Sequence, residues 1–333
     1  METVSEGPNM LRRHFLMAAG IAALLIAIPG ASAQEPPPLK PKDQYTVGFS
    51  QPASASPWRK AQMESMKAEA AKLGHQLVHT DATGSADKQV ADVKGMIAQG
   101  VDLVFLAPRD EKPLIPAVMA AKSAGIPVIL LDRNVDQSLA QAGKDYVTFI
   151  GSDFVEQGKR AAEALTKAMG GNAKILQLEG FPGSSPAINR RKGFEDAIKV
   201  HPGMRIVASQ PGDFERAKGR QVAEALLQAH PDANAIYAHN DEMALGAIAA
   251  LEAAGKKPGQ DVTVVSVDGT RAALQAIVEG KLLATVESNP RFGPKAFETM
   301  ARYARGERIE PWVVVPDGFF DKSNAAQLVS QAY

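Results

Sequence analysis

The sequence predicts an α/β protein built from two arrays of parallel strands, with helices on both faces of each sheet. Several continuous apolar runs end in a charged or amide residue just before a helical pattern begins, among them VILLDR, IYAHND and VVSVDG. Such runs are typical of parallel strands buried on both faces. Strand and helix patterns also alternate along the chain, which indicates crossover connections. A boundary near 152–153 divides the pattern into two lobes, whose strand tips would share one cleft.

The elements of each array follow from this alternation. The first array is expected to hold five strands, at 45–50, 76–82, 101–108 and in the runs IPVILLDR and YVTFIGSD. A helix near Trp58 is expected to end at Gly74, and another to run from Pro113 to Gly125, because proline suits a helix start and glycine its end. The second array is expected to hold strands in AKILQLEG, RIVASQPGDF, NAIYAHND, VTVVSVDG and LATVESN, with helices such as 215–229 and 242–254 between them.

Composition excludes several classes of function. The chain has 333 residues, enough for two domains, and 45% of them are apolar. The 37 basic residues equal the 37 acidic ones, so no net positive field is expected to recruit nucleic acid or an anionic membrane. There is no cysteine, which excludes disulfides, cysteine metal sites and a cysteine-linked lipid anchor.

The N-terminal segment is typical of an export signal. A short basic region at 10–13 precedes an apolar run at 15–28, which is shorter than the roughly 20 residues of a membrane span. The small residues Ala31-Ser32-Ala33 then predict cleavage after about Ala33, so that 1–33 is a signal peptide. The twin arginines at 12–13 leave open whether export uses the general or the twin-arginine route. The mature protein is expected in a periplasm, and the proline-rich segment 34–43 is expected to be a disordered leader.

Polar residues at the expected strand tips are the candidates for ligand binding, because open α/β sheets bind ligands at the carboxyl ends of their strands. Three arginines, Arg59, Arg133 and Arg190, offer rigid forks that can engage adjacent hydroxyls. Asp132, Asp268 and Glu287 can accept hydrogen bonds from hydroxyls, and Asn240 can both donate and accept. The three acids would balance the three arginines, which favours a neutral, hydroxyl-rich ligand over a phosphate or an acid.

Two aromatic residues near strand ends are further candidates. Trp58 and Phe214 lie outside the apolar runs, and an aromatic ring packs well against the C–H face of a sugar. The alternative for each is a packing residue at a helix start. The glycine-containing run GFPGSS is not followed by the residues of a P-loop, and no dinucleotide-binding glycine motif follows the first strand. His75 and His79 span a strand start and do not suggest a metal pair, so no metal or other cofactor is expected.

Several longer motifs resemble the ribose-binding-protein family of periplasmic sugar-binding proteins, also called periplasmic binding proteins of type I. They are VGFSQ with SPWR, VILLDR, GDFERAKG, AHNDEMALGAIAALEAAG and VVSVDGT, and the resemblance runs from about Tyr45 to Val315. The Trp-Arg pair after the first strand looks most like the galactofuranose-binding branch. The resemblance implies two Rossmann-like lobes joined by three crossovers. We expect the N-terminal lobe at 44–152 plus 288–312 and the C-terminal lobe at 153–287 plus 313–333.

The resemblance also implies a binding set. It assigns to the ligand Ser56, Trp58, Arg59, Asp132, Arg133, Arg190, Phe214, Asn240 and Asp268. Two positions depart from the family pattern. Glu287, Ser288 and Asn289 stand where a glutamine is expected, and we expect Glu287 and Ser288 to complete the binding set. Arg59 stands where ribose-binding members have an aromatic residue. Both departures argue against ribose as the ligand.

The resulting functional hypothesis is a secreted, monomeric receptor of a sugar-importing ATP-binding-cassette transporter. It would bind a monosaccharide, such as galactofuranose or another hexose, and would deliver it to the membrane permease. An alternative is a receptor that presents sugar to a chemotaxis or sensor-kinase protein. An enzyme is disfavoured because no nucleophile–base pair is visible. A transcriptional repressor of related fold is disfavoured because a signal peptide stands in place of a DNA-binding domain.

Overall fold

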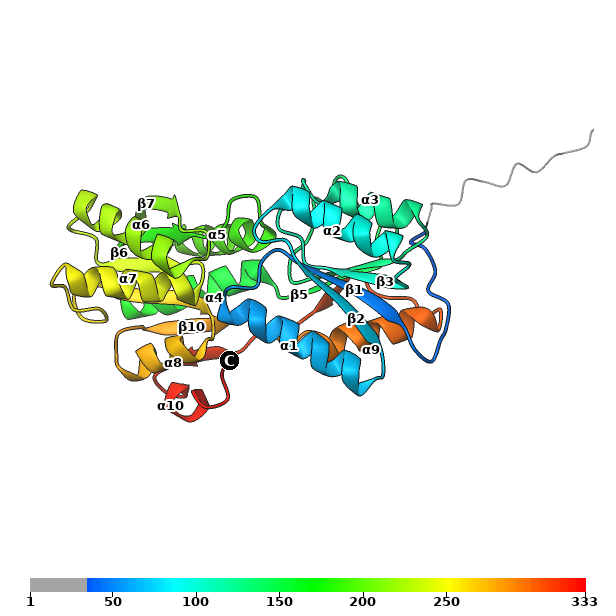
Figure 1. The fold of residues 1–333 in the computed structure, drawn as a ribbon. Helices are drawn as coiled ribbons and strands as arrows, with labels where there is room; N and C mark the ends of the chain where they lie inside the picture. The colour runs from blue at the N-terminus through cyan, green and yellow to red at the C-terminus, as the bar shows by residue number, and fades with distance from the viewer. Residues whose placement is uncertain (1–34) are drawn as a thin grey trace, which may run out of the picture. The chain divides into compact units, whose positions relative to one another are not determined.

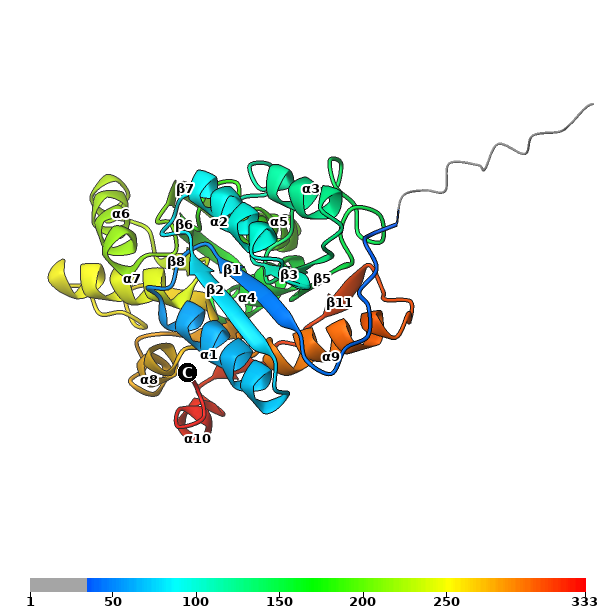
Figure 2. The same cartoon turned by 45° about the vertical axis from the view of Figure 1, so that its right-hand side comes forward.

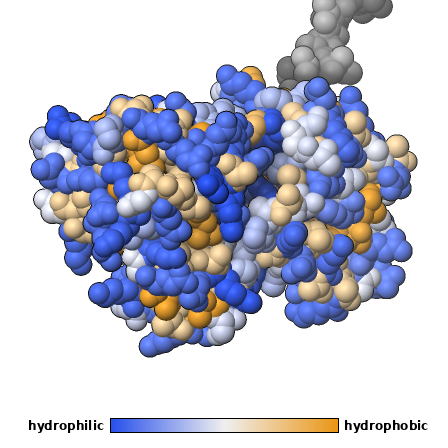
Figure 3. All heavy atoms as spheres, turned by 60° about the vertical axis from the view of Figure 1, so that its left-hand side comes forward, coloured by the Kyte–Doolittle hydropathy of each residue, from blue (hydrophilic) through white to orange (hydrophobic). Residues whose placement is uncertain are grey.

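The computed structural model describes residues 35–333, which form two lobes, each built around a six-stranded sheet (Figure 1). The predicted signal peptide at 1–33 lies outside the described residues. Within the described part, no helix combines the length and the apolar character that crossing a membrane requires. Figure 3 shows a mostly hydrophilic face that is hollowed between the lobes.

The first lobe has a fully parallel sheet in the order β11-β5-β4-β3-β1-β2. Its strands are β1 (Thr46–Gln51), β2 (Gln76–Asp81), β3 (Leu103–Leu106), β4 (Val128–Leu131), β5 (Thr148–Gly151) and β11 (Trp312–Val314). One face carries α1 (Pro57–Lys72) and α9 (Gly293–Ala304), and the other carries α2 (Ala86–Ala98) and α3 (Ile115–Ser123) (Figure 2). A hydrophobic core therefore lies on each side of the sheet, as the continuous apolar strands predict.

The second lobe repeats this plan with the strand order β12-β10-β9-β8-β6-β7. Its strands are β6 (Asn172–Glu179), β7 (Gly203–Pro211), β8 (Ala235–Ala238), β9 (Thr263–Asp268), β10 (Ala284–Glu287) and the antiparallel edge strand β12 (Phe319–Asp321). One face is covered by α4 (Phe154–Ala168) and α5 (Ser185–Ile198). The other is covered by α6 (Arg216–Ala229), α7 (Asp241–Ala253) and α8 (Arg271–Val278), with α10 (Ala325–Leu328) against α8.

Each sheet has a topological switch point next to its first strand. In the first lobe β1 lies between β2 and β3, and in the second β6 lies between β7 and β8. The crossovers on the two sides of that strand run in opposite directions, which opens a crevice at the carboxyl ends of the strands. The loops after these strand ends line one common pocket.

The structure corrects three details of the expected arrays. Each sheet has six strands rather than about five, because the chain adds a short strand to each sheet on its third passage between the lobes. The chain leaves the first lobe after Val315, whose N–H donates to Gly151 O. The expected boundary at 312–313 is too early, because all of β11 pairs with β5. The helix expected from Pro113 starts two residues later, at Ile115.

The expected disordered leader is wrong for its described part. Leu39 is buried in the core shared with α1 and α9, and the Tyr303 hydroxyl donates hydrogen bonds to Pro36 O and Pro37 O. The segment 35–43 thus packs against the first lobe in an extended form without regular secondary structure.

Candidate ligand-binding site

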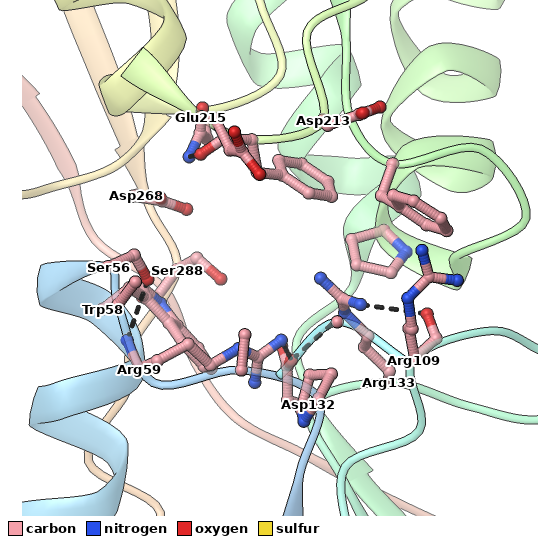
Figure 4. Close-up of a pocket in the computed structure, with 18 of the residues that line it drawn as sticks. Ser56, Trp58, Arg59, Arg109, Asp132, Arg133, Asp213, Glu215, Asp268 and Ser288 are labelled. Carbon is pink, nitrogen blue, oxygen red and sulfur yellow. Dashed lines mark hydrogen bonds and ion pairs between the residues drawn. The ribbon is translucent and has the colours of Figure 1, made fainter. Parts of the chain in front are cut away.

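A pocket of about 340 Å³ lies between the lobes and is lined by loops that follow the strands of both sheets (Figure 4). This volume is at the small end of the range of roughly 300–1,000 Å³ that is usual for ligand sites. Ten of the eleven expected residues line it: Ser56, Trp58, Arg59, Asp132, Arg133, Arg190, Phe214, Asn240, Asp268 and Ser288. Figure 4 shows Asp268, Ser56 and Ser288 on one side of the pocket and Arg109 and Arg133 on the other.

Glu287 is the one expected residue that does not line the pocket. Its Oε2 accepts a 2.7 Å hydrogen bond from Gly318 N, on the third passage between the lobes. Glu287 is the last residue of β10, and side chains alternate in direction along a strand, so its neighbour Ser288 faces the pocket instead. The carboxylate of Glu287 therefore links two passages between the lobes, and of these two neighbours only Ser288 lines the pocket.

Backbone strain is concentrated at the pocket. Five non-glycine residues among those described have a positive φ: Thr83, Asp132, Asp213, Phe214 and Asp268. The last four line the pocket, and Thr83 precedes Gly84, which also lines it. Such conformations cost of order 1–3 kcal/mol each and persist where the surrounding structure holds them in place, which is common at functional sites.

Arg190 is held rigidly by the second lobe. Its Nε donates to Gln157 Oε1 at 2.8 Å, and its Nη1 donates to the main-chain oxygen of His239 at 2.6 Å. Nη2 lies 3.5 Å from Asp268 Oδ1, a long contact that leaves both groups able to bond a ligand. Burial, opposed by Arg190, raises the pKa of the Asp268 carboxyl well above its usual value.

Asp132 and Arg133 each present a buried polar atom whose contacts within the protein are ion pairs and not hydrogen bonds. Asp132 Oδ2 and Arg133 Nε are both buried and make no hydrogen bond within the described protein, and they lie 3.8 Å apart. A ligand hydroxyl could donate to the first and accept from the second, which would satisfy both groups. Burial, together with the charge of Arg59, lowers the pKa of the Arg133 guanidinium to about 9.

Arg59 supports Asp132 from the side of α1. Its Nη2 lies 2.7 Å from Asp132 Oδ2, and its Nη1 donates to Gln62 Oε1 at 2.9 Å. Most of its fork is therefore engaged within the protein, whereas the sequence suggested a fork directed at the ligand. Arg59 acts at least partly by holding the carboxylate of Asp132.

The aromatic residues line the pocket from opposite lobes. The Trp58 indole N–H donates to Ser288 O at 2.7 Å, and the ring packs edge-on against Phe292. The Phe214 ring lies directly on the backbone at Gly180, where an added Cβ would come within 1.9 Å of it, so no other residue fits there. Asn240 donates to Phe214 O and caps α7, which holds this loop in place.

Asp268 is also supported from behind the pocket. Its main-chain oxygen accepts a 2.8 Å hydrogen bond from the Tyr333 hydroxyl and a 3.0 Å bond from Ser288 N. Because Asp268 has a φ of 136°, these two bonds stabilise a backbone conformation that an aspartate rarely adopts.

Several pocket residues were not predicted from the sequence. The polar and aromatic ones are Arg109, Asp213, Glu215 and Phe181. Arg109 follows β3 and could have been found by the rule that identified the other strand tips. Asp213 and Glu215 flank Phe214 in the GDFE run. Counting these residues, four arginines face four carboxylates around the pocket, so the predicted balance of charge holds for a larger set.

The two lobes contact each other at the pocket rim. Glu111 N donates to Gly183 O at 3.0 Å, and Asn134 N donates to Ser185 Oγ at 2.9 Å. The Arg109 guanidinium lies over the Phe181 ring at 3.6 Å from its centre. This is the arrangement expected for lobes that have closed on each other. No cluster of possible metal ligands occurs in residues 35–333.

Comparison with known proteins agrees with this architecture. Residues 47–308 match the family model described as a periplasmic binding protein domain. The galactofuranose-binding protein YtfQ of Escherichia coli K12 is 39% identical over 78% of this chain and 82% of its own length. A Mycobacterium smegmatis protein in complex with β-D-fucofuranose is 42% identical, with a TM-score of 0.82 over 86% of this chain and 94% of the other.

A second solved structure is the periplasmic binding component of the arabinose transporter from Shewanella sp. ANA-3, bound to α- and β-L-arabinofuranose. It is 39% identical, with a TM-score of 0.81 over 86% of this chain and 95% of the other. The resemblance found in the sequence is thus confirmed, and the chain belongs to the periplasmic binding protein family.

Proposed function

We propose that the protein binds a neutral monosaccharide between its lobes and delivers it to the permease of an ATP-binding-cassette importer. The observation that carries this proposal is the pair of buried polar atoms on the pocket wall, Asp132 Oδ2 and Arg133 Nε, which make no hydrogen bond within the described residues, although Oδ2 also lies in the ion pair with Arg59. A buried acceptor and a buried donor so close together suit a hydroxyl, which can bond both. A phosphate or carboxylate would add negative charge next to Asp132 and Asp268.

We further propose a hexose in its furanose form, such as galactofuranose, over ribose. The name of the 39% identical relative says that it binds galactofuranose, and the two solved structures hold furanose sugars. Arg59 with Asp132 forms a charged wall where ribose-binding members have an aromatic residue. That wall offers hydrogen bonds to an additional exocyclic hydroxyl.

The remaining parts of the proposal concern location and mode of action. The segment 1–33 would be removed on export, and the protein would act as a monomer without a chemical step or a cofactor. The lobes would comprise 44–152 plus 288–315 and 153–287 plus 316–333, with the third boundary moved to follow Val315. The relatives found by comparison are binding proteins, which supports binding over catalysis.

A thermal-shift screen tests the ligand class. Pentoses, hexoses and polyols would be compared at the same concentration, with a sugar phosphate and a sugar acid as charged controls. A ligand at 100 times its dissociation constant stabilises the fold by about 2.7 kcal/mol. We expect neutral sugars able to form furanoses to give the largest shifts. A preference for the charged controls would contradict the proposal. Uptake of the bound sugar by cells with and without the gene then separates transport from signalling.

A further inference from the structure

The three chain segments that pass between the lobes meet at the side chain of Asp317. Asp317 itself lies on the third passage, between β11 and β12. Its Oδ1 accepts hydrogen bonds from Ser152 Oγ on the first passage, at 3.0 Å, and from Asn289 N on the second, at 3.1 Å. A single carboxylate therefore connects all three passages.

The other oxygen of this carboxylate is connected to the pocket through Gln157. Asp317 Oδ2 accepts a 2.7 Å hydrogen bond from Gln157 Nε2, and Gln157 Oε1 accepts a 2.8 Å bond from Arg190 Nε. Gln157 and Arg190 are both buried, and Arg190 lines the pocket whereas Asp317 does not. An unbroken chain of hydrogen bonds thus runs from the passages between the lobes to a pocket arginine.

The carboxylate sets the direction of this chain. A carboxylate only accepts hydrogen bonds, so Gln157 must turn its NH₂ group toward Asp317 and its carbonyl oxygen toward Arg190. An asparagine at 317 could donate as well as accept. The Gln157 amide could then turn round and face the Arg190 Nε–H with a second donor. Glu287 O, 3.3 Å from Gln157 Nε2, supports the present orientation only weakly.

We propose that Asp317 is a positioning residue that couples the hinge between the lobes to Arg190. Rotation of the lobes moves the three passages relative to one another, and Gln157 transmits the position of the Asp317 carboxylate to the guanidinium. A sugar bound to Arg190 in turn favours the arrangement in which all three passages bond to Asp317, because coupling between two sites is reciprocal. This inference rests on the proposed function, since it takes Arg190 as a sugar ligand.

Asp317→Asn tests the coupling with little change in shape, and Asp321→Asn is the matched control. The Asp321 carboxylate accepts hydrogen bonds from Ser323 in the same part of the chain but contacts no passage between the lobes. We expect Asp317→Asn to weaken binding of the sugar found in the screen by about tenfold, and the control to leave it unchanged. Small-angle scattering should show less compaction with saturating sugar for Asp317→Asn than for the control.

A double-mutant cycle separates positioning from a general loss of stability. In an Arg190→Lys background, which lacks the guanidinium, Asp317→Asn should weaken binding by no more than about twofold further. A tenfold effect in both backgrounds would mean that Asp317 acts independently of Arg190, and would overturn the proposal. Unchanged affinity and compaction in the single variant would overturn it as well.

Gln157→Met provides a second route if Asp317→Asn does not fold. It removes the connection but keeps a side chain of similar length, and it should reproduce both the weaker binding and the loss of coupling to Arg190. Normal sugar affinity in Gln157→Met would overturn the proposal. If the wild-type protein binds no sugar at all, the proposed function fails. Tight binding that neither Asp317→Asn nor Gln157→Met weakens would overturn only the proposed coupling.

Discussion

Arg59 Nη2 lies 2.7 Å from Asp132 Oδ2, and both side chains are less than one tenth exposed. This ion pair connects the start of α1 to the tip of β4 at the wall of the pocket. Removing one partner of a buried ion pair leaves the other charge buried and unpaired. This lowers the free energy of unfolding far more than the loss of a surface pair does. The pair therefore has consequences for both stability and ligand choice.

Arg59→Ala should lower the free energy of unfolding by about 3–5 kcal/mol, the usual cost of removing one partner of a buried pair. Arg220→Ala is the control, because the pair between Arg220 and Glu224 on α6 is exposed and should contribute at most about 1 kcal/mol. Urea unfolding measures both. Equal losses of unfolding free energy in the two variants would mean that the Arg59–Asp132 pair contributes no more to stability than an exposed pair.

Arg59 should also influence which sugar binds. We expect the wild-type protein to bind galactose, through its furanose form, more tightly than ribose, and Arg59→Phe to narrow that gap. A site built to hydrogen-bond a hydroxyl discriminates because its own polar groups are left unpaired when that hydroxyl is missing. Competition binding with galactose, fructose, arabinose and ribose on both proteins is the measurement. Wild-type preference for ribose, or the same ranking in both proteins, would show that Arg59 does not set specificity.

Sugar should shift the lobes toward the closed form. The contacts at the rim, including Asn134 N with Ser185 Oγ, are made only when the lobes are close together. Three narrow passages permit a hinge, so ligand binding selects the compact state. Small-angle scattering should show a smaller radius of gyration with sugar, and Asp268→Ala serves as the control at a sugar concentration that saturates the wild type but not this weaker-binding variant. An identical radius with and without sugar in the wild type would argue against closure.

Asp241 should make stability depend on pH in an unusual direction. It is fully buried and accepts hydrogen bonds from Ser266, Thr270 and Thr285. Burial raises the pKa of its carboxyl above the ordinary value, and these hydrogen bonds only partly oppose that rise. A raised carboxyl pKa contributes stability that is complete below the ordinary pKa of about 3.9 and is lost as the pH rises through the folded-state pKa.

The difference in unfolding free energy between wild type and Asp241→Asn should therefore shrink as the pH rises from about 3.5 to 7. Asp196→Asn is the opposite control, because hydrogen bonds from Lys192 and Lys199 lower the pKa of Asp196 to about 2. Its difference from wild type should grow with pH as the carboxyl of the unfolded chain ionises. Denaturant unfolding of the three proteins across this range measures both slopes. If the two differences from wild type changed with pH in the same direction and by the same amount, burial would not control the titration of Asp241.

The fold and most of the site could be predicted because both depend on local patterns. Buried parallel strands are continuous apolar runs, so β4, β8 and β9 and the polar residues after them, such as Asp132 and Asn240, are visible in the sequence. The ten expected residues that line the pocket lie at such strand tips or in motifs shared with the family. The short strands β11 and β12 were missed because three residues are too few to show a pattern.

The rest could not be predicted because it depends on contacts between distant parts of the chain. Glu287 and Ser288 are adjacent in the sequence, and only the geometry of β10 decides which of them faces the pocket. The role of Asp317 rests on partners about 160 residues away, Ser152 and Gln157, and has no local signature. The engagement of Arg59 by Asp132 likewise appears only when α1 and β4 are packed together.

Calorimetric titration with galactose tests whether this pocket is the sugar site. The wild type would be compared with Arg133→Ala, Arg190→Ala and Asp268→Ala. Each substitution removes charge-assisted hydrogen bonds of roughly 1.5–3 kcal/mol, so affinity should fall about ten- to hundredfold or more. Circular dichroism of the free variants should show an intact fold. We expect one sugar per wild-type chain and weakened binding in all three variants. Unchanged affinity in all three would contradict the assignment of this pocket as the sugar site.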